Sequence, residues 1–102
     1  MKYGFCRVNG LQVFYRECGC TDKPVFLLLH GFPSASHQFR NLMPLLETRF
    51  HLIAPDLIGF GQSAAPDRRH FHYTFENLTE VMERFLDAMS IKKFYLYVFD
   101  YG

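Results

Sequence analysis

A single acidic residue, Asp100, directly follows the apolar run of residues 94–99 and precedes Tyr101 and Gly102. A free aspartate has a pKa of about 3.9, so at pH 7 its carboxylate is charged and can attack an electrophile without a general base to activate it. Taken alone, an acid after a buried strand is most often only the first polar residue of a loop. The segments upstream therefore decide whether Asp100 is a reactive group.

Two further segments have the composition of loops that follow strands. Residues 30–33 read His-Gly-Phe-Pro after the apolar run 25–29, and residues 56–63 read Asp-Leu-Ile-Gly-Phe-Gly-Gln-Ser after the short apolar run 51–54. In open parallel sheets, ligands bind beyond the carboxyl ends of the strands, where such loops converge. We therefore expect residues 30–33, 56–63 and 100–102 to meet at one edge of a sheet.

The segments that must position these loops begin with a hairpin. Asn9 and Gly10 form a pair that readily takes the positive φ angles of a two-residue turn. The turn predicts antiparallel strands over residues 3–8 and 11–17.

Three further runs predict strands. The continuous apolar run 25–29 is typical of a central strand buried on both faces, and residues 51–54 predict a short strand that stops at Pro55. The run 94–99, Phe-Tyr-Leu-Tyr-Val-Phe, has the same buried character. At the end of this chain we expect it to form an uncovered apolar edge, which makes the chain prone to aggregation.

Two helices are predicted between these strands. Ser34 and Ser36 are candidate N-caps for the first, which should be kinked or divided at Pro44. Thr74 is the candidate cap for the second, whose apolar residues recur every three or four positions and so share one face. These apolar residues are Leu78, Val81, Met82, Phe85, Leu86 and Met89. The fold class is therefore α/β, an antiparallel hairpin followed by parallel strands with crossover helices.

Composition narrows the class of partner. A net charge of +1 over 102 residues gives neither a basic stripe for nucleic acid nor a patch for an anionic membrane, so we expect a small-molecule partner. The N-terminus lacks a signal-peptide core, and the longest apolar run is too short to span a bilayer, so we expect a soluble, cytoplasmic chain. Cys6, Cys18 and Cys20 form no even set and are expected to be free thiols in a reducing compartment.

In this order and context, the three loops resemble those of a known family. A strand followed by His-Gly-Phe-Pro and a helix, then Pro-Asp-Leu-Ile-Gly-Phe-Gly-Gln-Ser, then an amphipathic helix and Val-Phe-Asp-Tyr-Gly, looks like the N-terminal part of the α/β-hydrolase fold. The likeness runs from the hairpin to Gly102. Within the family, the sequence is most similar to the epoxide hydrolase and haloalkane dehalogenase branch, whose nucleophile is aspartate.

The resemblance assigns roles to particular residues. It places Asp100 at the nucleophile position, with Gly102 as the small residue that the sharp turn requires. The backbone N–H groups of Phe32 and Tyr101 would form the oxyanion hole. The remaining motif residues, which the resemblance makes structural, are His30, Gly31 and Pro33.

An aspartate nucleophile implies a particular reaction. Its attack on the carbon of an epoxide or an alkyl halide leaves an ester, which water can cleave, whereas a serine would leave an ether. The expected activity is therefore hydrolysis of an epoxide or related electrophile through an alkyl-enzyme ester, without a cofactor. Haloalkane dehalogenases generally hold the departing halide with a Trp after the nucleophile and often an Asn in the His-Gly loop. This chain has Tyr101 and Phe32 there, which favours an epoxide, although Val98 matches a branched residue common in dehalogenases.

The resemblance also implies that residues 1–102 are an incomplete domain. The general-base histidine, its acidic partner and the cap domain lie after the nucleophile in the family, so we expect this chain to end at the nucleophile elbow and to be inactive alone. There are two alternatives to an epoxide hydrolase. The chain could be a haloalkane dehalogenase-like hydrolase, or it could be a truncated product that is a non-catalytic interaction partner. None of the histidines of this chain matches the position of the family's catalytic histidine. They are His30, His37, His51, His70 and His72.

Other polar residues have simpler interpretations. His70 and His72 could ligate a metal, but two ligands without a third favour a solvent-facing loop and no metal site. Asp56 and Ser63 are expected to organise their own loop by hydrogen bonds to the backbone. The glycines of residues 59–61 lack the third glycine of a dinucleotide-binding loop.

Overall fold

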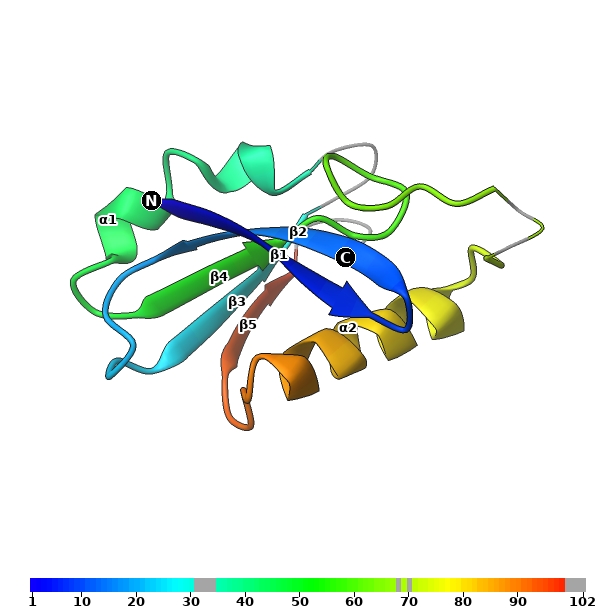
Figure 1. The fold of residues 1–102 in the computed structure, drawn as a ribbon. Helices are drawn as coiled ribbons and strands as arrows, with labels where there is room; N and C mark the ends of the chain where they lie inside the picture. The colour runs from blue at the N-terminus through cyan, green and yellow to red at the C-terminus, as the bar shows by residue number, and fades with distance from the viewer. Residues whose placement is uncertain (31–34, 68, 70, 99–102) are drawn as a thin grey trace.

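The computed structural model describes residues 1–30, 35–67, 69 and 71–98. Its centre is a mixed five-stranded sheet in the order β1-β2-β4-β3-β5 (Figure 1). The strands are β1 (Lys2–Val8), β2 (Leu11–Cys18), β3 (Val25–Leu29), β4 (His51–Pro55) and β5 (Tyr95–Val98). The α/β class predicted from the sequence is confirmed.

The predicted hairpin is formed by β1 and β2. They pair antiparallel from Val8 opposite Leu11 to Lys2 opposite Glu17. The turn residues Asn9 and Gly10 have φ angles of 50° and 78°, the positive values that a two-residue hairpin turn of the type I′ class requires.

The strands β3, β4 and β5 form the parallel part of the sheet. β3 lies between the other two and pairs parallel with both. Its adjacent residues Leu27 and Leu28 are 2% and 0% exposed, and they belong to core clusters on opposite faces of the sheet. This confirms that the apolar run 25–29 is a central strand buried on both faces.

One face of the sheet is covered by α2 (Phe75–Ala88), the helix predicted after Thr74. The Thr74 Oγ1 accepts a hydrogen bond from the N–H of Asn77 at 3.1 Å, which confirms the cap. The apolar stripe packs against the sheet, and its most buried residues are Leu78, Val81, Met82 and Phe85. Among the described residues, none of the helices combines the length and the apolar character needed to cross a membrane.

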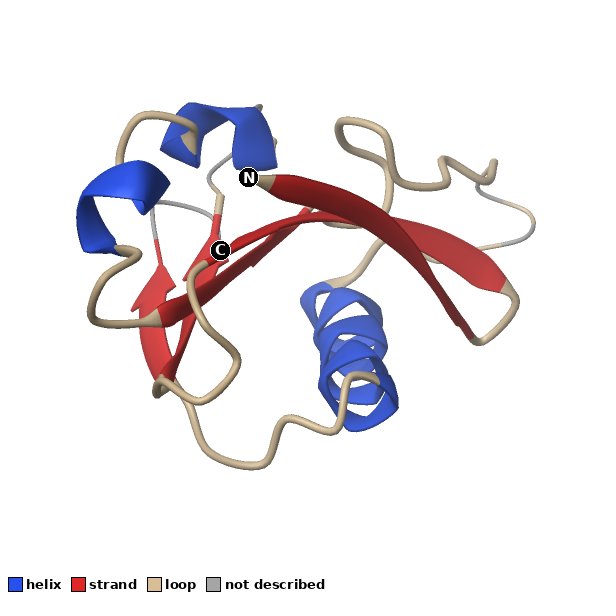
Figure 2. Ribbon diagram, turned by 60° about the vertical axis from the view of Figure 1, so that its left-hand side comes forward, coloured by secondary structure: helices blue, strands red, loops and turns tan. Residues whose placement is uncertain are grey.

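The other face is covered by two short helices, η1 (Ser36–Phe39) and α1 (Met43–Leu46) (Figure 2). The predicted division at Pro44 is confirmed, because the proline lies in the first turn of α1, where its missing N–H costs nothing. The prediction of Ser36 as an N-cap is wrong. Ala35 is the cap, and Ser36 is the first helical residue. The other candidate, Ser34, lies outside the described residues.

The edge strand β5 is exposed along its whole described length. The exposed fractions of Tyr95, Leu96, Tyr97 and Val98 lie between 40% and 61%. Within the described part of the chain β5 pairs only with β3, so its other edge is uncovered, as the sequence predicted.

Candidate active site

Most of the predicted site residues lie outside the described residues. These are Gly31, Phe32, Pro33, Asp100, Tyr101 and Gly102. His30 is described, as are the three strands that carry the predicted loops. The described part of the site consists of the strand ends and of the hydrogen bonds that surround them.

The strands β3 and β5 end level with each other, with Leu29 paired to Val98. Because β4 also runs parallel to β3, its last residue, Pro55, lies at the same edge of the sheet. The three described strands thus end at one edge of the sheet. This is the edge at which open parallel sheets bind their ligands.

His30, the first residue after β3, is fully buried. Its Nε2 accepts a hydrogen bond from the backbone N–H of Leu57 at 2.9 Å, and its ring lies edge-to-face against Phe60. A nitrogen that accepts this bond carries no proton, so Nε2 could act as a base only by giving up its partner. The geometry is that of a residue that joins the end of β3 to the loop after β4.

Asp56, the first residue after β4, is 1% exposed and is the centre of that loop. Its Oδ2 accepts the N–H of Gln62 at 2.9 Å, and its Oδ1 accepts the N–H of Ser36 at 2.6 Å. The chain passes so closely around the carboxylate that a Cβ at Gly61 would lie 2.2 Å from Oδ2, and Gly61 has a φ of +54°. Two backbone N–H groups from different segments of the chain therefore share this buried carboxylate as their acceptor.

Ser63 fastens the same loop to the hairpin. Its hydroxyl donates to the carbonyl oxygen of Asp56 at 2.6 Å and accepts the N–H of Phe14 at 2.8 Å. The bonds within residues 56–63 confirm the prediction that Asp56 and Ser63 organise their loop. The bonds to Ser36 and Phe14 extend this role to η1 and β2.

Arg16 of β2 is also part of this arrangement. Its role was not predicted from the sequence. Its Nε donates to the Oγ of the buried Ser36 at 3.0 Å. A chain of contacts therefore runs from Arg16 through Ser36 to Asp56. No local motif marks Arg16, because its partner lies 20 residues away in the sequence.

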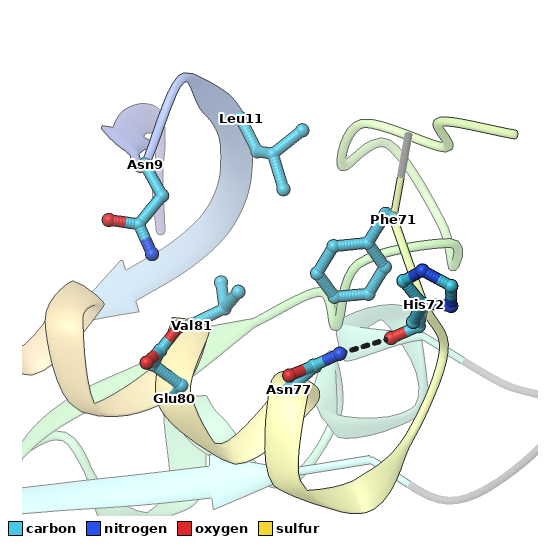
Figure 3. Close-up of a pocket in the computed structure, with 7 residues that line it drawn as sticks. All are labelled: Asn9, Leu11, Phe71, His72, Asn77, Glu80 and Val81. Atoms are coloured by element: carbon cyan, nitrogen blue, oxygen red, sulfur yellow. Dashed lines mark hydrogen bonds between the residues drawn. The ribbon is translucent and has the colours of Figure 1, made fainter. Parts of the chain in front are cut away.

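Two cavities lie beside the hairpin, and the second reaches the loop 56–63 through Gln62. A cavity of about 300 Å³ lies between the hairpin turn and α2, and contains none of the predicted site residues. Figure 3 shows its apolar side chains, Leu11, Phe71 and Val81, and the bond from the Asn77 amide to the His72 carbonyl. Another, of about 380 Å³, is lined by Tyr3, Phe14, Arg16 and Gln62.

The histidines do not form a metal centre among the described residues, where no group of three or more potential ligands comes together. His72 is exposed, and its predicted companion, His70, lies outside the described residues. His51 is nearly buried at the start of β4, where its Nε2 is bonded to the carboxylate of Glu17.

Comparison with known proteins identifies the fold family. Residues 24–102 match the family of the alpha/beta hydrolase fold. The chain belongs to this family. The buried His30, the loop around Asp56 and the level ends of β3 and β5 are thus features of an α/β hydrolase.

The relatives of this α/β hydrolase include haloalkane dehalogenases and a hydrolase whose activity is uncharacterized. A haloalkane dehalogenase of Bradyrhizobium diazoefficiens is 43% identical over 95 residues, which are 93% of this chain and 30% of the relative. An uncharacterized hydrolase of Saccharomyces cerevisiae is 50% identical over 94 residues, which are 92% of this chain and 32% of the relative.

Solved structures agree with these relatives. A loop variant of a haloalkane dehalogenase from Bradyrhizobium elkanii superposes with a TM-score of 0.93 at 40% identity, covering 99% of this chain and 33% of that one. The chain thus spans about a third of the length of the proteins that it matches.

Proposed function

We propose that this α/β hydrolase uses Asp100 as a nucleophile toward a saturated, electrophilic carbon. The observation that carries the proposal is the parallel pairing of β3 with β5, which end level at Leu29 and Val98. The described strands that precede Asp100 and the His-Gly motif in the sequence therefore end at the same edge of the sheet. Membership of the family supports a hydrolytic role for this edge.

In the proposed reaction an oxygen of the Asp100 carboxylate attacks the substrate carbon. For an epoxide, the ring C–O bond breaks and the released alkoxide takes up a proton, which leaves a hydroxyalkyl ester of Asp100. Water then attacks the ester carbonyl, and the N–H groups of Phe32 and Tyr101 would stabilise the oxyanion. This step regenerates the carboxylate and releases a diol.

An epoxide is the first substrate class that we propose. The side chains of Phe32 and Tyr101 do not provide the Asn and Trp donors that usually hold a departing halide. Carbon–halogen cleavage is the second candidate, favoured by the relatives that are haloalkane dehalogenases. Both substrates give an Asp100 ester, and they differ in whether halide is released.

We also propose that residues 1–102 are an incomplete domain that ends at the nucleophile elbow and belongs to a longer hydrolase. The matches to these relatives cover more than nine-tenths of this chain but only about a third of each relative. Alone it would form the ester but not hydrolyse it, because the general-base histidine and its acidic partner would lie beyond residue 102. The free state of Cys6, Cys18 and Cys20 is consistent with the cytoplasmic location that we propose.

Intact-mass spectrometry of the 102-residue chain after incubation with a small aryl epoxide tests the proposal. We expect one added epoxide, mapped to Asp100 and released by mild base as an ester is, with no sustained diol formation. Asp100→Asn should prevent this adduct. A base-stable adduct would report alkylation of a thiol such as Cys20 instead.

Two outcomes contradict the proposal. An unmodified Asp100 would argue against the nucleophile and would favour a non-catalytic role for the chain. Repeated diol formation by the 102-residue chain would contradict its incompleteness. The same incubation with a 1-haloalkane, followed by halide measurement, distinguishes the two substrate classes.

A further inference from the structure

We propose that Arg16 is the centre of a binding site for a small organic carboxylate, on the face of the hairpin opposite α2. The neighbouring residue of β2, Tyr15, packs its ring against Phe85 of α2. Side chains alternate between faces along a strand, so Arg16 lies on the other face, where its Nε meets Ser36. Through Gln62, the lining of the site reaches the loop that follows β4.

The guanidinium of Arg16 is held in a fixed orientation by three contacts. Its central carbon lies 5.2 Å from the ring centroid of Tyr3 and 5.6 Å from that of Phe14. Its Nε donates to the Oγ of Ser36, which is itself fully buried and fixed through its own N–H to Asp56. An arginine held in this way loses little conformational entropy when it binds a ligand.

The charge of Arg16 is not compensated by an acid among the described residues. The described ion pairs are His51 with Glu17 and Arg69 with Asp67. Among the described residues, Arg16 makes its hydrogen bond through Nε, so the N–H groups of its two terminal nitrogens remain available to a ligand. A guanidinium presents these donors as a planar fork that matches the two oxygens of a carboxylate.

An open surface cavity that Arg16 lines has room for a small ligand. Arg16 lines the cavity of about 380 Å³ together with Tyr3, Phe14 and Gln62. The two aromatic rings offer apolar walls, and the Gln62 side chain offers an amide that can donate or accept. The lining therefore fits an anion that carries an apolar or aromatic group, with the carboxylate directed at Arg16.

An NMR titration of the 102-residue chain with benzoate tests this site. We expect benzoate to shift the resonances of residues around the cavity with a millimolar dissociation constant. Benzamide has the same shape without the charge, and inorganic phosphate has charge without the apolar ring. We expect both to bind at least about tenfold more weakly, since each lacks one of the two contacts.

Two arginine variants provide the matched comparison. Arg16→Met keeps the apolar stem and should raise the dissociation constant of benzoate at least about tenfold, because the charge and the fork are lost. Arg7→Met removes the same charge from the same hairpin, where Arg7 is exposed and bonds the Gly10 carbonyl. It should leave benzoate binding within about twofold, since its effect on the site is screened by solvent.

The proposal is overturned if benzamide binds as tightly as benzoate, or if Arg16→Met binds benzoate like the parent chain. Circular dichroism checks that the variants fold. If Arg16→Met does not fold, Arg16→Lys keeps the charge and removes the fork, and should still weaken binding. Equal affinity of the lysine variant would contradict the assigned role of the fork.

Discussion

The backbone N–H of Ser36 donates to the Oδ1 of Asp56 at 2.6 Å, although the two residues are 20 positions apart. This buried bond joins the start of η1 to the loop after β4. His30 makes a second link to the same loop, through the N–H of Leu57. The described residues on either side of segment 31–34 are therefore both bonded to one loop, at the edge of the sheet where we propose that the reaction takes place.

Removal of the Asp56 carboxylate should destabilise the fold strongly. Asp56→Ala leaves the N–H groups of Ser36 and Gln62 without their acceptor, and we expect a loss of about 2–4 kcal/mol in the free energy of unfolding. Asp56→Asn, which keeps one oxygen, should lose less. Chemical denaturation measures both, with the exposed Asp22→Ala as a control that should change stability by less than about 0.5 kcal/mol. An equal effect of the two alanine variants would contradict the central role of Asp56.

A glycine at position 90 should stabilise the chain. Helix α2 ends in a Schellman motif, in which the N–H of Ser90 bonds the Asp87 carbonyl and the N–H of Ile91 bonds the Leu86 carbonyl. Ser90 has a φ of +60°, so Ser90→Gly relieves strain and should add about 0.5–1 kcal/mol to the free energy of unfolding.

A second glycine variant supplies the control for this prediction. Ala88→Gly introduces the same residue at the last helical position of α2, where no positive φ is required, and should destabilise the chain. Thermal denaturation reports both signs. A stability change of the same sign in the two variants would argue against the capping explanation.

A charge on β5 should reduce self-association of the 102-residue chain. The strand exposes Leu96 by 52%, and its uncovered edge can pair with another chain. Leu96→Lys places a charge on that edge and should lower the light scattering of concentrated solutions. Leu45→Lys adds the same charge to α1, where Leu45 is 77% exposed, and should have little effect. Equal scattering by the two variants would contradict association through β5.

The three thiols should differ in reactivity. Cys20 is exposed, whereas Cys18 is buried in β2, where burial and, to a lesser degree, the Glu47 carboxylate raise its pKa. The thiolate is the reactive form, so a disulfide reagent at neutral pH should modify Cys20 first and Cys18 last. Peptide mapping of partly labelled protein checks this order, and early labelling of Cys18 would contradict its burial.

The raised pKa of Cys18 also gives a sign for the dependence of stability on pH. The folded state holds the thiol proton more tightly than the unfolded state, whose pKa is 9.0. The contribution of Cys18 is therefore fully present below pH 9 and is lost as the pH rises through 9 toward the folded-state pKa. Denaturation of the parent chain and of Cys18→Ala at both pH 8 and pH 10 should show a larger loss in the parent. A parallel loss would exclude Cys18 as the cause.

Features that depend on near neighbours in the chain could be predicted from the sequence. Asn9 and Gly10 specify a turn by their own φ preferences, and Thr74 caps α2 through a residue three positions away. The alternation of Leu27 and Leu28 between two core clusters also follows from the period of a strand. In each case the physical cause lies within a few residues.

Features that depend on distant partners could not be predicted in this way. Ser36 has the residue type of an N-cap, but its N–H is bonded to Asp56 and its hydroxyl to Arg16, each 20 positions away. These contacts place Ser36 inside η1, where it is fully buried. The role of Arg16 was missed for the same reason, since a single arginine in a strand carries no local pattern.

The strand order has a consequence for the synthesis of the chain. Both neighbours of β3 in the sheet, β4 and β5, come after it in the sequence. As the chain leaves the ribosome, the hairpin can pair at once, but the apolar β3 has no native partner until residue 55 has emerged. The nascent chain therefore carries an apolar segment without its native partner through that interval, and chaperones bind segments of this kind.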